Sequence, residues 1–268
     1  ADKVDGEFHA YLQRTDPTRH HVQTLCSFVL YHTLLVMREY FTLGFELNLF
    51  APYEFTYVYW YASELVFKWL GNVLDRAQNF IVREYQHSSK DKSKNDRKRN
   101  FRLKKEAEMR KRIVLGQERI IYWQASQRMC EAFFKANIGL LITGKTRLPL
   151  GGGESIRFDH RMAAFSCLNT PPPIRYEQYR EMSRIDALIR FGAEKCLKDA
   201  ADAFDSARSH LEHLDVSASF QQEASTMAKV CKNNAVVLRL MASGHKSDSK
   251  APPTLDFSCC SMYPLLKL

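Results

Sequence analysis

The stretch from Gly44 to Tyr61, GFELNLFAPYEFTYVYWY, decides how this chain folds. Eight of its residues are aromatic, which is a quarter of all aromatic side chains in the chain. Pro52 suits the first turn of a helix, because its missing N–H would have no partner there. The aromatic alternation from Phe55 to Tyr61 taken by itself suggests a strand, so the residues that follow have to decide between strand and helix.

Those residues favour a helix. Polar side chains recur at the spacing of one helix face, at Glu64, Lys68, Asn72 and Asp75. Apolar side chains such as Leu65, Phe67 and Trp69 surround this polar stripe. A helix that is apolar on most of its faces must be buried, either in a core or against other chains.

The composition indicates an ordinary globular chain. A length of 268 residues with 45% hydrophobic content allows one large domain or two small ones. The seven cysteines are scattered and form no CxxC pair, which favours reduced thiols in the cytosol over a disulfide framework. The apolar run 25–37 is too short for a membrane span, which needs about 20 residues. We therefore predict a cytoplasmic protein without membrane contact.

The net charge of +9 is concentrated in one segment. Residues 90–112 hold twelve Lys or Arg against four Asp or Glu. One interpretation is a solvated linker and charged helix face, and the other is electrostatic contact with phosphates. Because Phe101 is the only aromatic residue of the segment, contact with the RNA backbone is favoured over base stacking. The candidate ribosome or phosphate contacts are Lys90, Lys92, Lys94, Arg97, Lys98, Arg99, Arg102, Lys104 and Lys105.

Periodicity and breaker residues predict an all-α scaffold of five or six helices with a C-terminal antiparallel helix hairpin. The stretch HSSKDKSKNDRKRN, residues 87–100, has no apolar residue and is predicted to be disordered at its centre. The predicted regions are an aromatic-rich helical pair (16–86), a basic, partly disordered linker and helix start (87–112), a long amphipathic helix (113–144), an irregular Gly/Pro-rich connection (145–175), the hairpin region (176–244) and an extended tail (245–268).

The hairpin prediction depends on two apolar patterns with alternating spacings of four and three residues. They are Ala193, Leu197, Ala200, Phe204, Ala207, Leu211 and Leu214, and then Met227, Cys231, Asn234, Leu238 and Met241. Asn234 lies at a core position, where a buried Asn can set the register of paired helices. The only strand segments we expect are short pieces near 155–166. We detect no internal repeat of the solenoid type.

Three patterns suggest chemistry but lack its context. Gly139–Thr146 matches the GxxxxGK[ST] phosphate loop, yet a helical pattern precedes it and Pro149 with three glycines follows. His160 beside Asp159, with Cys167 nearby, shows no nucleophile geometry. His245 with the adjacent Cys259 and Cys260 does not have zinc-ligand spacing. We predict no catalytic, cofactor-binding or metal-binding residues.

Four segments, in order, resemble a known family. They are Gly44-Phe45-Glu46-Leu47 with Glu54, Tyr59-Trp60-Tyr61 and Glu64; Thr170-Pro171-Pro172-Pro173 with Tyr176, Glu181 and Met182; Gly244-His245-Lys246 with Pro252-Pro253; and Phe257-Ser258 with Pro264-Leu265-Leu266-Lys267-Leu268. The chain resembles the C-terminal part of the large auxiliary subunit of NatC N-terminal acetyltransferases, from about residue 20 onward. We expect it to be a fragment or a processed piece of such a subunit.

The resemblance implies a non-catalytic scaffold. A NatC complex transfers acetyl from acetyl-CoA to the α-amino group of nascent chains that begin with Met and a hydrophobic residue. The auxiliary subunit would hold the catalytic subunit and a small Sm-like subunit, and would help docking on the ribosome. The glycine-rich turn (R/Q)-x-x-G-x-(G/A) of a catalytic chain is not found, which agrees with that role. We expect acetyl-CoA to be used by the catalytic partner and not bound by this chain.

The partner interface has two candidate sites, the aromatic helix and the tail. Its candidate residues are Tyr57, Tyr59, Trp60, Tyr61, Phe257, Tyr263 and Leu265. Tyr and Trp are enriched at interface hot spots, but core burial is the default for such a pattern, and the tail can equally lie in a groove of its own chain. Two other function classes are weighed: a basic helical module that binds nucleic acid or ribosomes without an acetyltransferase, and a phosphate-loop nucleotide hydrolase, which fails on context.

Overall fold

The computed structural model of the protein describes residues 25–88, 96–146, 148, 153–168, 174–214, 218–244 and 253–267, together with residues 7 and 10. Within these residues the chain is helical apart from connections and one pair of short strands, so the all-α class is confirmed. No helix in this described part is long and apolar enough to cross a membrane.

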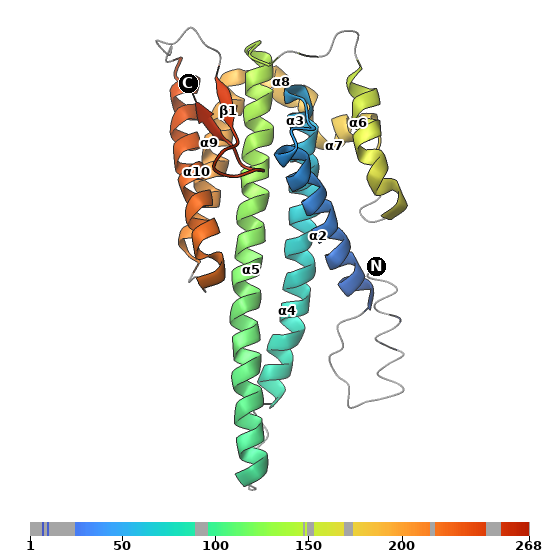
Figure 1. Ribbon diagram of the computed structural model, residues 1–268, viewed down its shortest axis with the longest axis vertical. Coiled ribbons are helices and arrows are strands. Elements are labelled where there is room, and N and C mark those ends of the chain that lie inside the picture. Colours follow the sequence, from blue (N-terminus) through green and yellow to red (C-terminus); the bar gives the residue numbers. More distant parts are fainter. Residues whose placement is uncertain are drawn as a thin grey trace.

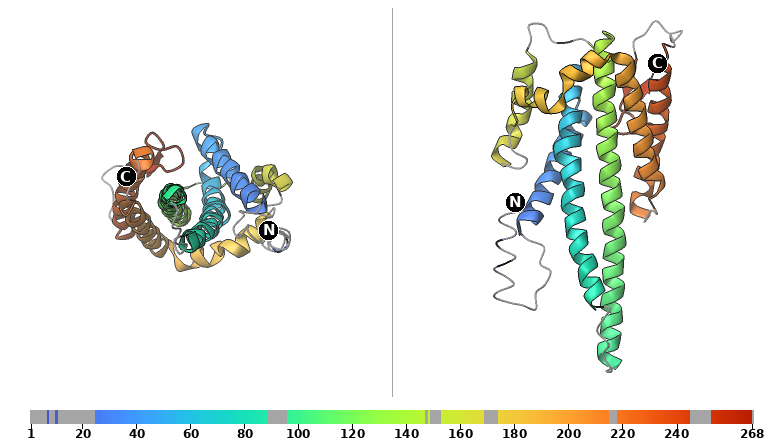
Figure 2. Two further views of the ribbon diagram at one scale, coloured as in Figure 1. Left: turned by 90° about the horizontal axis from the view of Figure 1, so that it is seen from below. Right: turned by 180° about the vertical axis from the view of Figure 1, so that it is seen from behind.

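One long helix, α5 (Asp96–Ile142), runs through the whole molecule (Figure 1). On one side it packs against α4 (Lys68–Ser88), and α2 (Leu25–Glu46) lies against α4. On the other side it packs along α9 (Ala193–Glu212), which is paired with α10 (Ala218–Ala242). The view along the long axis in Figure 2 shows α5 between these two groups of helices.

The aromatic stretch begins one continuous helical rod. It starts with the single turn η1 (Pro52–Glu54), continues as α3 (Phe55–Tyr61) and the π-helical turn η2 (Ala62–Phe67), and becomes α4. Pro52 occupies the first turn, as predicted. In η2 the Lys68 N–H donates to the Ser63 carbonyl, five residues earlier. The Ser63 hydroxyl donates to the Gln127 carbonyl of α5 at 3.2 Å, which ties the widened turn to the central helix.

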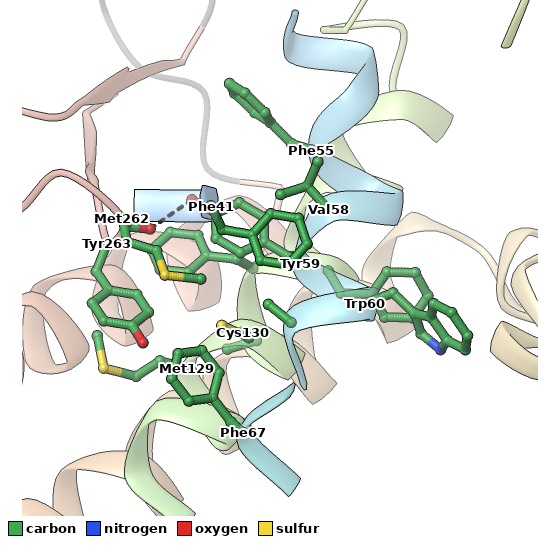
Figure 3. Packing of buried hydrophobic residues seen from close by; sticks show 14 of the residues in the cluster. Phe41, Phe55, Val58, Tyr59, Trp60, Phe67, Met129, Cys130, Met262 and Tyr263 are labelled. Atoms are coloured by element: carbon green, nitrogen blue, oxygen red, sulfur yellow. Dashed lines mark hydrogen bonds between the residues drawn. The ribbon is translucent and has the colours of Figure 1, made fainter. Parts of the chain in front are cut away.

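Tyr59 is at the centre of the hydrophobic core. Its ring stacks on Phe133 of α5 at a centroid distance of 4.8 Å and on Phe45 of α2 at 5.0 Å. Its hydroxyl donates to the Met262 carbonyl of the C-terminal segment at 2.9 Å (Figure 3). One side chain therefore joins α2, α3, α5 and the C-terminal segment. The strand alternative for this stretch is excluded, because all seven residues of α3 are buried within a helix.

The C-terminal hairpin forms as predicted, and the faces named from periodicity are the buried ones. Leu197, Phe204 and Leu211 of α9 and Cys231 and Leu238 of α10 are all buried. α5 and α9 approach closely at Gly139. A Cβ atom at this position would lie 2.7 Å from Leu197 Cδ2, which is closer than packed side chains tolerate.

The irregular connection predicted for 145–175 is wrong over its middle part. The structure has α6 (Glu154–Met162) followed by the 3₁₀ segment η3 (Ala163–Leu168), and the short strand pieces expected near 155–166 are this helix. Phe158 and Met162, four residues apart, are its buried residues and form one helix face. This short pattern lies between runs of Gly and Pro, which favour an irregular connection and hide the helix in the sequence.

Two short helices connect this region to the hairpin. The helix predicted near 176–185 is α7 (Tyr176–Ser183). It is followed by α8 (Ile185–Phe191), which was not predicted. Arg184 joins them in a left-handed conformation, with φ of 53°, and this one residue turns the chain between the two helices.

The basic segment is more helical than predicted. α5 already begins at Asp96, inside the stretch 87–100, which was predicted to be disordered at its centre. Lys and Arg are good helix formers, so a lack of apolar residues is no obstacle to extending an existing helix. The centre of the run, 89–95, lies outside the described residues, as does the beginning of the predicted helical pair at residue 16.

The C-terminal tail is extended, as predicted, and its described part folds back on its own chain. β1 (Thr254–Asp256) and β2 (Leu265–Lys267) pair antiparallel, with Leu255 opposite Leu266. β2 packs on α10. The strand pair lies beside the upper part of α5, on the side of α10 (Figure 1).

Candidate interaction surfaces

The N-terminal part of α5 projects beyond the other helices at one end of the molecule (Figure 2). It carries four of the predicted phosphate contacts, Arg97, Lys98, Arg99 and Arg102, along its backbone. Lys104 and Lys105, one turn further on, are exposed. Lys90, Lys92 and Lys94 lie outside the described residues. At a rise of 1.5 Å per residue, residues 96–112 span about 25 Å of helix.

This projection is anchored to α4 at its base. The Gln78 side-chain amide of α4 donates to the Ile113 carbonyl of α5. Gly116 leaves the room for it, because a Cβ there would lie 2.2 Å from Gln78 Oε1. Met109 is buried at the same level. The basic residues N-terminal to this contact are therefore carried by a helix whose base is fixed.

A shallow groove of about 740 Å³ runs along the same part of α5, with Tyr85 of α4 on its border. Exposed Leu103 and Val114 line it together with Arg110 and Lys111, and Glu106 and Glu118 also lie on it. The Arg110 guanidinium donates to the Tyr85 hydroxyl at 3.3 Å. Cations held at fixed helical spacing suit a polyanion such as a phosphate backbone, and the groove adds an apolar strip beside them.

The aromatic residues predicted as a partner interface belong to the core. Tyr57, Tyr59, Trp60 and Tyr61 are at most 4% exposed, and Tyr263 is 5% exposed. Their rings contact Phe158, Phe133, Tyr179 and Phe165 of this same chain. The structure therefore shows the core alternative for these five residues, which corrects their assignment as contact residues. Phe257 and Leu265 are half-buried, and partner contact through them stays a prediction.

The tail is held by Asn234 of α10. The Asn234 side-chain amide donates to the Pro264 carbonyl at 2.9 Å, and its oxygen accepts from the Leu266 N–H at 2.8 Å. The side chain thus pairs with the tail as a neighbouring strand would. This corrects the expectation that Asn234 sets the register of the helix hairpin. A polar residue on a core face signalled a buried partner, but its spacing gave no indication that the partner lies 30 residues further on.

A buried carboxylate, which the sequence suggested only as part of the family resemblance, joins the aromatic helix to α6. Glu54 is 1% exposed. It accepts hydrogen bonds from the Ala51 N–H at 2.6 Å, the Tyr57 hydroxyl at 2.6 Å and Arg161 Nε at 3.1 Å. Burial opposes ionisation, but these donors outweigh it and hold the pKa of Glu54 below its ordinary value. Glu at the third position after a helix start was the available signal.

Arg161 extends this network. Besides Glu54, its guanidinium donates to the Leu49 carbonyl, and the Tyr40 hydroxyl of α2 donates to the Arg161 carbonyl at 3.2 Å. Burial and the neighbouring Glu54 carboxylate together raise the pKa of Tyr57, so its hydroxyl stays a donor at every physiological pH. The cluster is fully paired, which is typical of a structural network.

The resemblance to a phosphate loop is explained by a helix end. Gly139 lies within α5, and Gly144 has φ of +69°. The Lys145 N–H donates back to the Leu140 carbonyl at 2.9 Å, as in a glycine-terminated helix. The backbone N–H groups of residues 143–146 therefore bond to carbonyls of the last helix turn and do not surround a cavity for phosphate.

The structure describes the other two chemical patterns only in part, because the side chain of Cys167 lies outside the described part. Asp159 and His160 are exposed on α6. Cys260 is half-buried and Cys259 is exposed, while His245 lies outside the described residues. Within the described residues, no group of three His, Cys, Asp or Glu side chains is arranged to hold a metal ion.

These features define a class of protein: a helical scaffold whose aromatic residues form its own core, with a basic projection at one end. Residues 1–266 match the family described as NAA35-like, TPR repeats, and the chain belongs to this family. The repeats were not detected in the sequence, where the predicted helices show no fixed period. In the structure, helix lengths range from 7 residues in α8 to 47 in α5.

Relatives in several animals support this assignment. The chain is 35% identical over 271 residues to the proteins named N-alpha-acetyltransferase 35, NatC auxiliary subunit, from Rattus norvegicus and Homo sapiens. These alignments cover 100% of this chain and 36% of each relative. A Drosophila melanogaster homolog is 31% identical over 92% of the chain. The chain thus spans about a third of the length of these relatives.

Solved structures show the same fold. A chain in the crystal structure of the NatC complex bound to Arl3 peptide and CoA superposes with a TM-score of 0.58 at 14% identity. The match covers 99% of this chain and 44% of that chain. A chain in the apo NatC complex gives the same TM-score, with coverage of 98% and 43%.

Proposed function

We propose that this chain is part of the non-catalytic auxiliary subunit of a NatC-type N-terminal acetyltransferase. The observation that carries the proposal is 35% identity over the whole chain to subunits of that name. The fold supports it, since α5 with helices on both sides forms an extended framework on which other chains can be held. In this role the chain contributes rigidity and surface, and the catalytic partner binds acetyl-CoA.

The proposed complex acetylates the α-amino group of nascent proteins that begin with Met and a hydrophobic residue. Its other members are the catalytic acetyltransferase subunit and a small Sm-like subunit, and it works in the cytoplasm. The surface of the tail region, including the half-buried Phe257 and Leu265, is the proposed contact with a partner. The absence of a glycine-rich coenzyme A turn from the sequence supports a role without catalysis.

A second role, docking on the ribosome, is favoured by the basic projection of α5. Most of the excess positive charge of the chain lies in residues 90–112, and the part from residue 96 is presented by one anchored helix. Ribosomal RNA is the polyanion that a co-translational enzyme meets.

The test is affinity purification of the tagged intact protein from cytosol, followed by mass spectrometry. Recovery of an acetyltransferase chain and a small Sm-like chain in stoichiometric amounts is the expected result. Recovery of ribosomes or RNA without an acetyltransferase would contradict the scaffold role and favour a basic nucleic-acid-binding module instead.

A further inference from the structure

Two adjacent cysteines lie in the loop between β1 and β2. Cys259 is exposed and Cys260 is half-buried, and both are free thiols. Cys130, Cys196 and Cys231 are also free thiols, but all three are buried. Among the cysteines whose side chains the structure describes, solvent therefore reaches the pair in the tail and not the others.

The loop that carries this pair is attached to the core on both sides of it. Before the pair, the Phe257 ring stacks on Phe45 of α2 at a centroid distance of 5.7 Å. After the pair, the Met262 carbonyl accepts the hydrogen bond of Tyr59 at 2.9 Å, and Met262 itself is 4% exposed. A change in the loop between these two contacts must therefore strain one of them.

Cys259 is the thiol that faces solvent and a cation. The Ser258 hydroxyl lies 3.9 Å from its Sγ. Lys267 of β2 pairs with Asp256 at 2.6 Å, which raises the pKa of Lys267, and a charge interaction with Cys259 adds to this effect. Accessible thiols beside a cation are the ones that peroxides attack first, because the thiolate is the nucleophile.

Cys260 has the opposite surroundings. Burial raises the pKa of its thiol, and hydrogen bonds from the backbone of Tyr263 and Met262 offset this effect only in part. Cys260 therefore stays protonated at neutral pH and is shielded from a reagent in solution. A thiol of this kind reacts second, with an oxidised sulfur that has already formed beside it.

We propose that Cys259 and Cys260 form a redox site that peroxides oxidise to a disulfide, and that this disulfide loosens the tail from the core. The Cys259 thiolate attacks one oxygen of hydrogen peroxide, and the O–O bond breaks to give a sulfenic acid and hydroxide, which takes up the thiol proton to become water. Cys260 Sγ then attacks Cys259 Sγ. The S–S bond forms, and the S–O bond breaks with loss of a second water that carries the Cys260 proton. The site does not depend on the association with an acetyltransferase.

The small ring that joins neighbouring cysteines makes the disulfide reversible and couples it to the tail. Consecutive Cα atoms are about 3.8 Å apart, whereas disulfides ordinarily join Cα atoms about 4.4–6.8 Å apart. Such a bond is strained and is easily reduced. Because one thiol faces solvent and the other is partly in the core, closing the ring has to draw the Cys260 side chain outward. Its hydrogen bonds with the backbone of Met262 and Tyr263 are then lost.

The test treats the reduced intact protein with hydrogen peroxide at low protein concentration. Trypsin releases both cysteines in a single peptide, residues 251–267, whose mass should fall by two hydrogen atoms and return to its first value with dithiothreitol. The reduced pair should also bind phenylarsine oxide across both thiols, and the oxidised pair should bind none. Hydrogen exchange at amides 262–267 should be faster in the oxidised protein, whereas exchange in α9 should be unchanged.

Three variants assign the reaction to this pair. Cys260→Ser should stop at the sulfenic acid of Cys259, which dimedone traps, and should form no disulfide. Cys259→Ser, at the exposed position, should resist peroxide, and it tests the site even if Cys260→Ser does not fold. Cys196→Ser is the matched control and should be oxidised like the wild type, because it removes a thiol outside the tail and keeps a donor for the Leu188 carbonyl. Circular dichroism checks the helix content of each variant.

A wild-type protein that forms only sulfenic, sulfinic or sulfonic acid would overturn the proposal, as would a disulfide from Cys260 to Cys130 or between two molecules. The wild-type product in Cys259→Ser or Cys260→Ser would overturn it as well. A disulfide within the pair that leaves hydrogen exchange at 262–267 unchanged would show that oxidation does not loosen the tail.

Discussion

Single residues in this protein connect elements that are distant in the sequence. Tyr59 bonds to the Met262 carbonyl, Asn234 bonds to Pro264 and Leu266, and Glu54 bonds to Arg161. Each bond joins a helix to a segment that has too few buried residues to fold by itself. Because a buried partner left without its bond costs more than the bond itself contributes, these residues should dominate the local stability of the tail and of α6.

Replacing Asn234 by Leu should release the tail. The change removes two hydrogen bonds and leaves the Leu266 N–H and the Pro264 carbonyl buried without partners, which should destabilise the protein by about 2–4 kcal/mol. Thermal unfolding should show a lower Tm, and the half-buried Cys260 should react faster with a thiol reagent. Asn233→Leu, the same substitution on the exposed neighbour, should change neither. Equal Tm values and labelling rates for both variants would show that Asn234 does not hold the tail.

Replacing Glu54 by Gln should make the protein less stable in a pH-dependent way. The folded state lowers the pKa of this carboxyl, so its ionisation stabilises the fold fully above the unfolded pKa of about 4.3. That contribution is lost as the pH falls through the lower folded pKa. At pH 7 the variant should be less stable by about 2 kcal/mol, the order expected for hydrogen bonds to a charged group.

Urea unfolding of wild type and Glu54→Gln between pH 7 and pH 3 measures this effect. The difference in the free energy of unfolding should shrink as the pH falls. A difference that is constant over this range would mean that the charge of Glu54 does not contribute and that only its shape does.

At the scale of elements, close helix packing depends on small residues at particular positions. Gly139 allows α5 and α9 to approach, and Gly116 makes room for Gln78 between α4 and α5. Gly71, within α4, has no atoms within 4 Å of where a Cβ would lie. Three glycines inside helices thus have different packing surroundings, although all three carry the same backbone entropy cost.

Substitution by Ala separates these cases. Gly71→Ala should stabilise the protein by up to about 1 kcal/mol through helix propensity. Gly139→Ala gains the same propensity but places a methyl group against Leu197, and overpacking costs about 1–3 kcal/mol. Chemical denaturation should therefore rank Gly71→Ala above wild type and Gly139→Ala below it. The opposite order would show that α9 yields easily at this contact.

The basic projection of α5 is the element on which ribosome contact depends. Changing Lys98, Arg99, Lys104 and Lys105 to Gln should reduce co-sedimentation with ribosomes. If all four contact phosphates, the slope of log affinity against log salt should fall by about 3, because each contact contributes about 0.7–0.9. Exchanging four other lysines on α9 and α10, Lys195, Lys198, Lys229 and Lys232, keeps the change of net charge equal and should have little effect. Equal salt dependence of both variants would rule out a specific contact through α5.

Much of the fold could be predicted from the sequence where apolar periodicity is long. The faces of α9 and α10 and the helix after Pro52 follow from spacing alone, because helix geometry is local. The short α6 and α8 were missed, since α6 has only two buried residues and α8 has none, which gives little periodic signal. Tyr59 and Asn234 were recognised as unusual, but their partners in the tail depend on how the chain folds back. The tail contact has no pattern in neighbouring residues.

At the scale of the whole molecule, the basic projection and the tail region are far apart along one rigid axis. α5 connects them, with its N-terminal end projecting beyond the other helices and its C-terminal half packed against α9 and the aromatic helix. Such a framework can hold a partner at one end while the other end contacts a polyanion. The partner and the polyanion would then keep a fixed spacing, which is what a scaffold provides to an enzyme acting on nascent chains.

We propose that this chain supports an acetyltransferase without catalysing the reaction itself. The most direct measurement is acetyl transfer from labelled acetyl-CoA to a Met-Leu peptide by three samples: the intact protein alone, the catalytic subunit alone, and both together. We expect no activity for the intact protein, low activity for the catalytic subunit, and a large increase for the two combined. Activity of the intact protein by itself, or a catalytic subunit whose activity does not change when the protein is added, would contradict this role.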